Sequence, residues 1–582
     1  MIDRRIGVLF VAFVTLLVLA LSRAAYLGTI KAGTLRADAA TQQVTTVPVP
    51  AARGAISDAS GTELAVSQTA DDVIADPFLV TASLKLRAAQ RLAPLLGRPQ
   101  PKVLAQLSEN RGFVYLAHAL PAAKAKAIME LTIDGKKIPG ISLVPQVTRA
   151  YPENSVASQV IGFVNEGDKG FGGLEYRYDK LLGGSAGERR VVFDALGQPI
   201  SIDDVHSAVP GKPITLTLNS ALQSEVEQVL AGVGSTYAPK GATAIVMNPN
   251  TGAILALANW PPVDANGVSG PNAATITKAQ LPDLQDRAVE FNYEPGSTFK
   301  AITVAGALQA GAITPGTKFD IPPYLQVYNQ QIHDAESHGY ETLSVAQILK
   351  YSSNIGADEI AMNKLGAARF NYWMHNFGFG TPTGVDLPGE EPGKVPPYST
   401  WSGTTIATLP FGQGLEVTPI QIASAYAAIA NGGLLRTPHI VSTIGGKPVP
   451  LAHGRRIISA AVASEMRDML RGVYADGGTA SGAAIPGFDL AGKTGTANVV
   501  VNGQYSKSQF IASFIGFVPA SSPKLEVMVM VDEPSQGSIY GGAVAAPAFA
   551  QIVGWAVPFL GINPCPAPCP SVAESLGQPT GG

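Results

Sequence analysis

The stretch Glu294-Pro295-Gly296-Ser297-Thr298-Phe299-Lys300 decides how the rest of the sequence is interpreted. Its Pro-Gly pair ends the preceding element, and an apolar helical pattern continues to Leu308. We therefore expect Ser297 in the first turn of a helix, with Lys300 three residues later on the same face. A serine hydroxyl becomes a useful nucleophile only beside a base, and a partly desolvated lysine can be that base. The free N–H groups of the helix N-terminus would stabilise an oxyanion.

Two further motifs lie downstream of this stretch. Ser352-Ser353-Asn354 falls inside a helical pattern, and Lys493-Thr494-Gly495-Thr496 opens a predicted strand. Ser-x-x-Lys, Ser-x-Asn and Lys-Thr-Gly in this order are typical of penicillin-binding proteins and class A β-lactamases. A second Ser-x-x-Lys, from Ser521 to Lys524, contains a proline and joins two strand-like runs, so it is interpreted as a hairpin turn. The context of the two tetrads therefore favours Ser297, and not Ser521, as the candidate nucleophile.

The apolar periodicity predicts the elements that carry these motifs. Asn219 or Ser220 is expected to cap a helix that runs to about Val233. Further helices are expected at residues 82–96, 299–309, 345–365, 420–431 and 545–560, and strands at 214–218, 242–247, 253–258, 509–518 and 525–531. This order suggests an α/β domain in which an antiparallel sheet packs against a helical lobe.

In that domain the helical lobe would separate the first two motifs and bring the third in on a sheet edge, beside a cleft. Lys493 would place a cation at the cleft wall, and Thr494 and Thr496 would add hydroxyl groups, which together suit a substrate carboxylate. Gly495 would permit a close backbone approach.

The N-terminus determines the compartment. An apolar run from Ile6 to Leu21 follows Arg4 and Arg5, which predicts one spanning helix with its N-terminus in the cytoplasm and the rest of the chain outside. The alternative is a cleaved signal peptide, because Ala20-Leu21-Ser22 offers small residues at a suitable spacing. In both cases the body of the protein is exported.

Composition excludes several classes of protein. The net charge of -3 over 582 residues provides no basic excess for a phosphate backbone, so nucleic acid is not an expected partner. The two cysteines, Cys565 and Cys569, lie in a Pro-rich tail, so the body has neither a disulfide framework nor a cysteine metal site. A local disulfide between them is permitted in an oxidising compartment.

Competing chemical motifs are weak. Gly183 to Gly187 matches the Gly-x-Ser-x-Gly pattern of hydrolases, but no strand enters it and no helix leaves it, so a loop is expected. The histidines form no helical pair at metal-binding spacing; for His333 and His338 we favour a surface or turn role over ligation. No Gly-rich phosphate loop is visible.

Taken together, the sequence resembles the class B penicillin-binding proteins, the monofunctional peptidoglycan D,D-transpeptidases, over nearly its whole length. Beyond the three motifs, the resemblance rests on residues typical of the family's pedestal: Arg53-Gly54, Ile56, Asp58, Arg149, Tyr151-Pro152, Gly173-Leu174-Glu175, Tyr178 and Gly187. It implies a fold like that of the serine β-lactamases, with an antiparallel sheet and a helical lobe, preceded by a transmembrane helix and an elongated α+β pedestal. The implied domains are an anchor at 1–27, a pedestal or dimerisation domain at 28–211, a transpeptidase domain at 212–563 and a flexible tail at 564–582.

Three segments resemble the cell-division branch of this family, the FtsI type. They are 377–380 (Phe-Gly-Phe-Gly), 384–389 (Gly-Val-Asp-Leu-Pro-Gly) and 411–419, which contains Phe-Gly-Gln-Gly and Val-Thr-Pro. The resemblance implies septal cell-wall synthesis and an FtsW-type glycosyltransferase as partner. The sequence departs from the pattern at Ala59-Ser60, and at Asn498, where glutamine is commoner; the second departure could alter acceptor or β-lactam preference.

The family's roles transfer to matching positions. The implied catalytic residues are Ser297, Lys300, Ser352, Asn354 and Lys493; the substrate-binding residues are Thr494, Gly495 and Thr496; and the backbone N–H groups of Ser297 and Thr496 form the oxyanion hole. Neither a metal nor an organic cofactor is implied. The expected ligands are stem peptides, with a D-Ala-D-Ala donor and an amine acceptor, and β-lactams.

Four alternatives stay open at this point. An elongation-specific transpeptidase of the same class would share every motif. A D,D-carboxypeptidase or a β-lactamase would let water reach the acyl-enzyme. A penicillin-sensing or scaffolding protein would bind without turnover, although the few residues before the apolar run leave no room for a cytoplasmic signalling domain.

Overall fold

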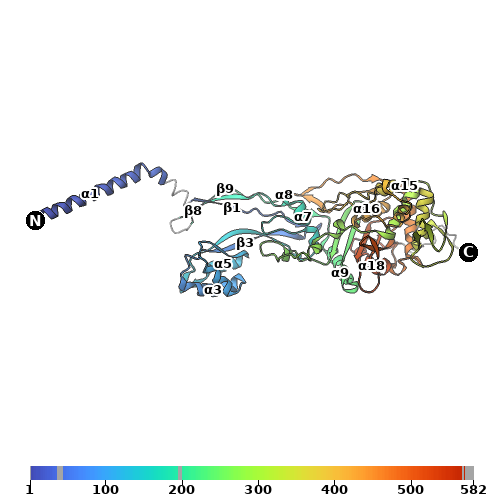
Figure 1. The fold of residues 1–582 in the computed structure, drawn as a ribbon, viewed down its shortest axis with the longest axis horizontal. Helices are drawn as coiled ribbons and strands as arrows, with labels where there is room; N and C mark the ends of the chain where they lie inside the picture. Colours follow the sequence, from blue (N-terminus) through green and yellow to red (C-terminus); the bar gives the residue numbers. More distant parts are fainter. Residues whose placement is uncertain (1, 36–43, 194–198, 329, 566–568, 570–582) are drawn as a thin grey trace. The chain divides into compact units, whose positions relative to one another are not determined.

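The computed structural model describes residues 2–35, 44–193, 199–328, 330–565 and 569 (Figure 1). The chain divides into two compact units, and each is described by itself. The first unit comprises Met1–Ala52, Thr69–Val147 and Gly184–Gly211, and the second comprises Arg53–Gln68, Thr148–Gly183 and Lys212–Gly582. The second unit therefore contains two segments that precede residue 211, the expected linear boundary. Most of the expected tail lies outside the described residues, but Cys565 and Cys569 form a disulfide with their Cα atoms 5.3 Å apart.

The N-terminal helix α1 (Ile2–Thr29) is a candidate membrane span. Its segment Arg4–Thr29 has a mean hydropathy of 2.4, and its side chains are exposed. A second helix, α18 (Gly541–Phe559), is also long and apolar enough, but half of it is buried in the core of the second unit. Exposed apolar side chains along a helix of this length suit a lipid environment, so α1 fits a membrane anchor.

The first unit combines a three-stranded sheet with a helical cluster. β1 (Val44–Val49), β8 (Gly187–Phe193) and β9 (Pro199–His206) form an antiparallel sheet in the order β1-β8-β9. The other elements of this unit or at its borders are β3 (Glu63–Ala75), α3 (Ala82–Leu96), α4 (Gln100–Leu107), β4 (Val114–Pro121), α5 (Ala122–Glu130), β5 (Thr132–Ile133), β6 (Lys136–Lys137) and β7 (Ile141–Ala150). The predicted helix at 82–96 is confirmed, and Gly97 ends it in the left-handed conformation at φ 63°.

A five-stranded antiparallel sheet organises the second unit. Its order is β12-β11-β23-β22-β21. The strands are β11 (Gly241–Asn248), β12 (Ala253–Trp260), β21 (Ala491–Val501), β22 (Gln504–Val518) and β23 (Leu525–Asp532). The predicted strands at 242–247 and 253–258 pair with each other, and so do those at 509–518 and 525–531, while the strand that contains Lys493 lies at the sheet edge, as expected.

The two faces of this sheet pack against different helices. Because successive residues of a strand point to opposite faces, Ala244 and Phe514 join the core with α9 (Ser220–Tyr237) and α18, whereas Ile245 and Ile515 join the core of the helical lobe. Figure 1 shows α9 and α18 beside one another. This double burial explains why β23 is apolar along nearly its whole length. The predicted α/β architecture is confirmed.

The helical lobe contains the elements around the first two motifs. They are the 3₁₀ helix η2 (Gly296–Phe299), α12 (Lys300–Gln309), α13 (Val345–Tyr351), α14 (Asn354–Glu359), the π-helical turn η3 (Ile360–Leu365), α15 (Ala367–Asn376), α16 (Pro419–Ala430) and α17 (Ala460–Arg471). The prediction of one continuous helix over 345–365 was wrong. The helix is interrupted at Ser352, whose φ is 61°, and it restarts after Ser353.

Short strands complete the second unit. β10 (Ile214–Leu216) pairs in parallel with β2 (Ile56–Ser57) and antiparallel with β18 (Val441–Ile444). In the helical lobe, β13 (Lys318–Ile321) pairs with β16 (Glu341–Ser344), and β14 (Leu325–Val327) pairs with β15 (Gln330–Ile332). The remaining short α-helices and strands are α6 (Ser158–Ile161), α7 (Gly173–Arg177), α8 (Asp179–Leu182), α10 (Ala265–Val268), α11 (Arg287–Glu290), β17 (Leu434–Leu435), β19 (Lys447–Pro448) and β20 (Arg455–Arg456).

A buried ion cluster holds the early segments of the second unit together. Glu175 in α7 receives Arg53 Nε at 2.5 Å and Arg149 Nε at 2.6 Å, and all three side chains are almost completely buried. Asp179 accepts a further bond from Arg53 at 2.8 Å. Buried charges are tolerated only when they are paired in this way, so the cluster requires all three segments in place.

Candidate active site

The turn that carries Ser297 is built by close backbone packing. Gly296 has a φ of 57°, and a Cβ atom there would lie 3.0 Å from the carbonyl oxygen of Thr496. Ser297 follows in η2 and is partly exposed, whereas its neighbours on both sides are buried. No hydrogen bond joins Ser297 Oγ to another residue that the structure describes. The hydroxyl group is therefore positioned at a surface and is free to react.

Residues 411–414 form hydrogen bonds with the turn that carries Ser297. Gly296 donates its N–H to the carbonyl oxygen of Gly412 at 3.0 Å, and Gly414 donates its N–H to the Glu294 carboxylate at 2.9 Å. Partial burial raises the pKa of Glu294 to about 7. Residues 411–414, which the sequence had linked only by resemblance, thus share one hydrogen-bond network with the turn that carries Ser297.

Lys300 lies at the start of α12 and is completely buried. Its Nζ donates to the carbonyl oxygen of Ser352, and to Ser352 Oγ at 3.1 Å. Burial lowers the pKa of Lys300 to about 7, against the opposing influence of the Asp334 and Asp358 carboxylates. A lysine with this pKa is partly neutral at physiological pH, so it can accept a proton.

Ser352 lies between two lysines. Lys493 Nζ donates to Ser352 Oγ at 2.8 Å and to the carbonyl oxygen of Thr494 at 3.2 Å. Burial and the neighbouring Lys300 lower the pKa of Lys493 well below its usual range. The Ser352 hydroxyl group therefore contacts both amines: that of Lys300, close to the turn that carries Ser297, and that of Lys493, on the edge strand. The left-handed conformation of Ser352 is what aims both its carbonyl and its hydroxyl group at Lys300.

The edge strand β21 supplies the third motif. The expected place of Lys493 at a cleft wall needs correction, because its side chain is completely buried and the first partly exposed residue of the motif is Thr496. Thr494 Oγ1 donates to Thr479 Oγ1 at 2.8 Å, and Thr496 Oγ1 accepts the N–H of Gly541 at 3.0 Å. At Gly495, a Cβ atom would lie 2.3 Å from Ser513 Oγ, which explains the glycine.

Asn354 begins α14 immediately after the break. Its Nδ2 donates to the carbonyl oxygen of His333 at 2.8 Å. The Asp334 carboxylate accepts bonds from Ser353 Oγ at 2.7 Å and from the backbone N–H of Asn354 at 2.5 Å. The structure thus brings Lys300, Ser352 and Lys493 into one hydrogen-bonded cluster, with Asn354 two residues from Ser352.

Three residues near this cluster were missed by sequence reasoning. Asp334 and Thr479 belong to loops far from the motifs along the chain, so no local pattern marks them. Asp358 is fully buried in α14, and neither of its carboxylate oxygens has a partner among the described residues. Burial raises the pKa of Asp358 well above its usual range. No local pattern distinguishes it, because Glu359 directly follows it in the sequence.

The competing motifs fold as ordinary structure. The second Ser-x-x-Lys lies in the turn between β22 and β23, where Lys524 donates its N–H to the carbonyl oxygen of Val518 at 3.0 Å. Ser185 forms an isolated antiparallel bridge with Val209, and the following strand leaves from Gly187, which is the opposite order from a nucleophile elbow. Both predictions are confirmed.

Two family models match the chain. The penicillin-binding protein transpeptidase domain matches residues 242–554, and the penicillin-binding protein dimerisation domain matches residues 48–216. The first match covers more than half of the chain and contains all three motifs. The chain belongs to the penicillin-binding proteins that carry these two domains, which confirms the resemblance to class B.

Individual relatives agree with this assignment. The peptidoglycan D,D-transpeptidase FtsI of Escherichia coli K12 is 32% identical over 94% of this chain and 90% of its own length. The probable peptidoglycan D,D-transpeptidase PenA of Neisseria meningitidis is 31% identical over 96% of this chain and 93% of its own length. The crystal structure of penicillin-binding protein 3 from Mycobacterium tuberculosis in complex with aztreonam superposes with a TM-score of 0.68, at 27% identity, over 89% of this chain and 98% of that one.

Proposed function

We propose that this protein is a peptidoglycan D,D-transpeptidase that cross-links stem peptides through a serine acyl-enzyme at Ser297. The observation that carries the proposal is the position of Ser352 Oγ, within hydrogen-bonding distance of both Lys300 and Lys493. Two buried amines joined by one hydroxyl form a path along which a proton can move from the nucleophile side to the sheet edge. FtsI of Escherichia coli is named as a peptidoglycan D,D-transpeptidase, and PenA of Neisseria meningitidis as a probable one.

In the acylation step, Ser297 Oγ attacks the carbonyl carbon of the penultimate D-Ala. Neutral Lys300 accepts the hydroxyl proton, and the backbone N–H groups of Ser297 and Thr496 stabilise the oxyanion. The peptide C–N bond then breaks, and the terminal D-Ala leaves with a proton delivered through Ser352. A β-lactam follows the same path, but its leaving nitrogen stays tethered to the acyl group.

In the second step, an amine from another stem peptide attacks the ester carbon. Its proton returns along the same path to Ser297 Oγ, which restores the free enzyme and leaves a new peptide bond. Asn354 lies at the start of α14, where its side-chain amide can bind the donor's backbone. The residues of the chain supply every proton transfer in this scheme.

The donor's terminal carboxylate would bind at the edge strand. Because Lys493 is buried, the carboxylate would meet the hydroxyl groups of Thr494 and Thr496, with the Lys493 amine behind them. Gly495 keeps the strand backbone close to the neighbouring strand and to the nucleophile turn. In this arrangement the place where the carboxylate binds and the place where Ser297 reacts are separated by one layer of side chains.

We further propose that the domains follow the chain as an anchor at 1–27, a pedestal at 28–211, a transpeptidase domain at 212–563 and a tail at 564–582. The likeness to FtsI supports a role at the division septum, with the N-terminus inside and the catalytic unit outside the cytoplasmic membrane. A single anchor helix cannot polymerise glycan, so an FtsW-type glycosyltransferase would supply the strands. Replacement of residues 1–27 by an unrelated anchor should keep penicillin binding but weaken septal recruitment; normal localisation of that chimera would argue against a specific role for the anchor.

The serine mechanism is tested by mass spectrometry of the full-length protein in detergent after incubation with benzylpenicillin. We expect the mass of one intact penicillin on the peptide that contains Ser297, and none in Ser297→Ala. The matched control is Ser521→Ala, which removes the serine of the second tetrad and should label normally. Labelling of Ser297→Ala, or an adduct on Ser521, would reject the proposed nucleophile.

A further inference from the structure

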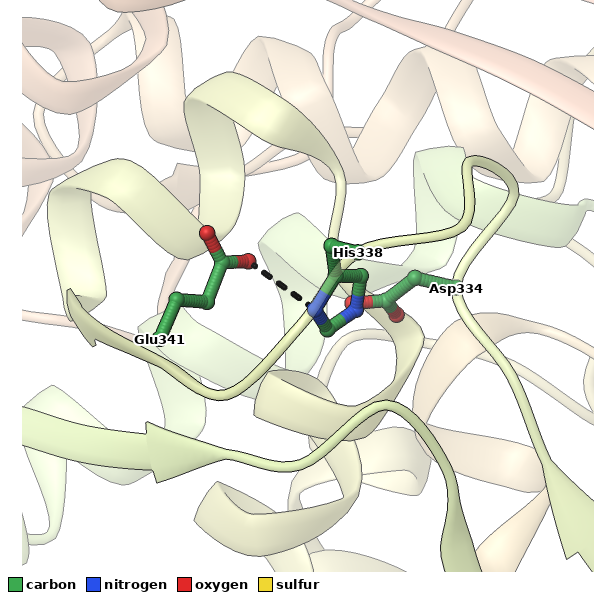
Figure 2. A group of neighbouring side chains, drawn as sticks. All are labelled: Asp334, His338 and Glu341. Carbon is green, nitrogen blue, oxygen red and sulfur yellow. Dashed lines mark hydrogen bonds and ion pairs between the residues drawn. The ribbon is translucent and has the colours of Figure 1, made fainter.

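The side chains of Asp334, His338 and Glu341 meet in one group, as Figure 2 shows, and Asp334 also contacts the Ser-x-Asn motif. Asp334 follows β15, His338 lies in the connecting segment 333–340, and Glu341 is the first residue of β16. The atoms that they present to one another lie within 4.8 Å. Asp334 and His338 are largely buried, while the Glu341 side chain is 41% exposed. The proposed transfer reaction assigns no role to any of the three.

Asp334 is the residue that ties this segment to the motif. One carboxylate oxygen accepts the backbone N–H groups of Asn354 at 2.5 Å and Ile355 at 3.0 Å. The other oxygen accepts Ser353 Oγ at 2.7 Å and faces His338 Nε2 at 3.1 Å. A carboxylate at a helix N-terminus is stabilised by the free N–H groups and by the helix dipole. Asp334 therefore fixes the orientation of the chain directly after Ser352.

His338 holds Asp334 from the opposite side. Its Nε2 faces Asp334, and its Nδ1 lies 2.7 Å from the carbonyl oxygen of Gly339 and 3.6 Å from the Glu341 carboxylate. Both ring nitrogens thus face oxygen acceptors, an arrangement that is satisfied when both carry a proton. Partial burial opposes the charge, but the Gly339 carbonyl and the two carboxylates outweigh it and raise the pKa of His338.

A metal ion suits these contacts less well than a proton. A bound metal needs a deprotonated ring nitrogen and a free carboxylate oxygen. Both oxygens of Asp334 already accept hydrogen bonds from the motif, and the Nδ1 contact with Gly339 is a hydrogen bond in length. The titratable groups that face Asp334 are His338, Lys300 and Asp358, and those that face His338 are Asp334 and Glu341.

We propose that Asp334 is a positioning residue for acyl transfer, and that the cationic ring of His338 holds it in place. Asp334 fixes residues 353–355, and through them it fixes the left-handed turn at Ser352 that aims the carbonyl and hydroxyl groups at Lys300. The His333 carbonyl oxygen holds the Asn354 side chain from the same segment. This inference rests on the proposed function, because it concerns the geometry of the same proton path.

The first arm of the test measures the second-order rate of acylation by a fluorescent penicillin in the full-length protein. Asp334→Asn keeps the shape of the side chain but loses the charge, and we expect a rate roughly 10- to 100-fold lower. Glu336→Gln is the matched control, because Glu336 is an exposed carboxylate of the same segment with no ion pair to another described residue. We expect it to react at the wild-type rate.

The second arm uses His338→Gln, which retains Asp334 and keeps the test informative where Asp334→Asn folds poorly. His338 loses its charge as the pH rises through its raised pKa, so wild-type acylation should fall on the alkaline side, and this fall should be absent in His338→Gln. A merely structural role would lower the rate equally at every pH. Thermal unfolding of each variant reports the folded fraction.

Four results would overturn the inference. They are a wild-type rate in Asp334→Asn, an equal loss in Glu336→Gln, an unchanged alkaline fall in His338→Gln, and a zinc-dependent rise in the melting temperature of the wild type that is lost in His338→Gln. The last result would mean that a metal ion occupies the place assigned to the proton. If the wild type itself is not acylated, the proposed function fails first, and this inference fails with it.

Discussion

The chain contains the tetrad Ser-x-x-Lys twice, and the two copies have opposite environments. The copy from Ser297 to Lys300 is a helical turn whose lysine is completely buried. The copy from Ser521 to Lys524 is a hairpin turn in which both end residues are exposed. In the first, the lysine amine contacts Ser352; in the second, the only Lys524 bond in the described part of the chain comes from its backbone.

The difference shows that burial, not the spacing of serine and lysine, creates a base. Burial brings the pKa of Lys300 to about 7, close to the pH at which the protein works. An exposed lysine stays an ammonium ion at that pH and cannot accept a proton. The neighbours of the first copy therefore matter as much as the tetrad itself.

The largest expected effect comes from Lys300→Met, which keeps the bulk of the side chain and removes its amine. Acylation by penicillin should slow by roughly 10²- to 10⁴-fold, because the general base is lost. Stopped-flow measurement with a fluorescent penicillin checks this. Lys524→Met is the matched control and should leave the rate unchanged. Equal losses in both variants would mean that the buried and the exposed lysine do not differ in their effect on acylation.

The next largest effect is expected at Lys493, a residue that has no counterpart beside the tetrad from Ser521 to Lys524. Lys493→Gln removes the amine behind the proposed carboxylate site and one partner of Ser352, so acylation should slow by about 10²-fold. The melting temperature should change much less, because the amine contributes recognition and not core packing. Residual activity that simply tracks the folded fraction would instead make Lys493 structural.

The pH dependence of acylation sharpens the same comparison. Lys300 accepts a proton only when it is neutral, so the rate should rise by about tenfold per pH unit below about pH 7 and level off above it, until the loss of charge on His338 brings the alkaline fall. Rates measured from about pH 5 to pH 9 test this. A profile that keeps rising to the usual pKa of an exposed lysine would mean that burial does not activate Lys300.

Asp358→Asn is the control for that profile. Burial raises the pKa of Asp358 well above its usual range, which favours the uncharged carboxyl group that asparagine resembles. The rising part of the profile, below about pH 7, should therefore not shift along the pH axis. A shift of this part to lower pH would reveal an ionised Asp358 that holds Lys300 in its protonated form.

The smallest expected effect is at Thr479. Thr479→Val removes the hydrogen bond to Thr494 Oγ1 and keeps the shape of the side chain. The loss of one such bond is worth about 1 kcal/mol, so the affinity for the donor or the β-lactam should weaken by about fivefold. A change confined to the maximal rate, with affinity intact, would place Thr479 in the chemical step and not in carboxylate binding.

Local patterns predicted those elements whose causes are local. The helix at 82–96 ends where Gly97 provides its C-cap, and the β11–β12 hairpin forms around Asn-Pro-Asn-Thr-Gly. The order of the three motifs predicted that they meet at a sheet edge. Two of the motifs belong to the helical lobe and one to an edge strand, and such a strand meets the helices of the lobe at the edge of the sheet. These parts of the fold and of the site follow from short-range propensity together with hydrophobic alternation.

The features that were missed depend on contacts between distant residues. The apolar pattern over 345–365 favours one helix, but Lys300, Lys493 and Asp334 hold the chain open at Ser352 and Ser353. Asp334 caps a helix that begins 20 residues later, a separation at which sequence gives no capping signal. The burial of Lys493 likewise follows from how β21 packs and not from the Lys-Thr-Gly triplet.

The parallel pairing of β2 with β10 affects how the chain must assemble. Ile56 leaves the ribosome long before its partner Ile214, and Arg53 likewise precedes Glu175. At a synthesis rate of about 5–20 residues per second, the early strand waits on the order of ten seconds without its partner. During that interval its hydrogen-bonding edge is open to incorrect pairing, so residues 53–68 are the segment of the nascent chain that a chaperone would need to protect first.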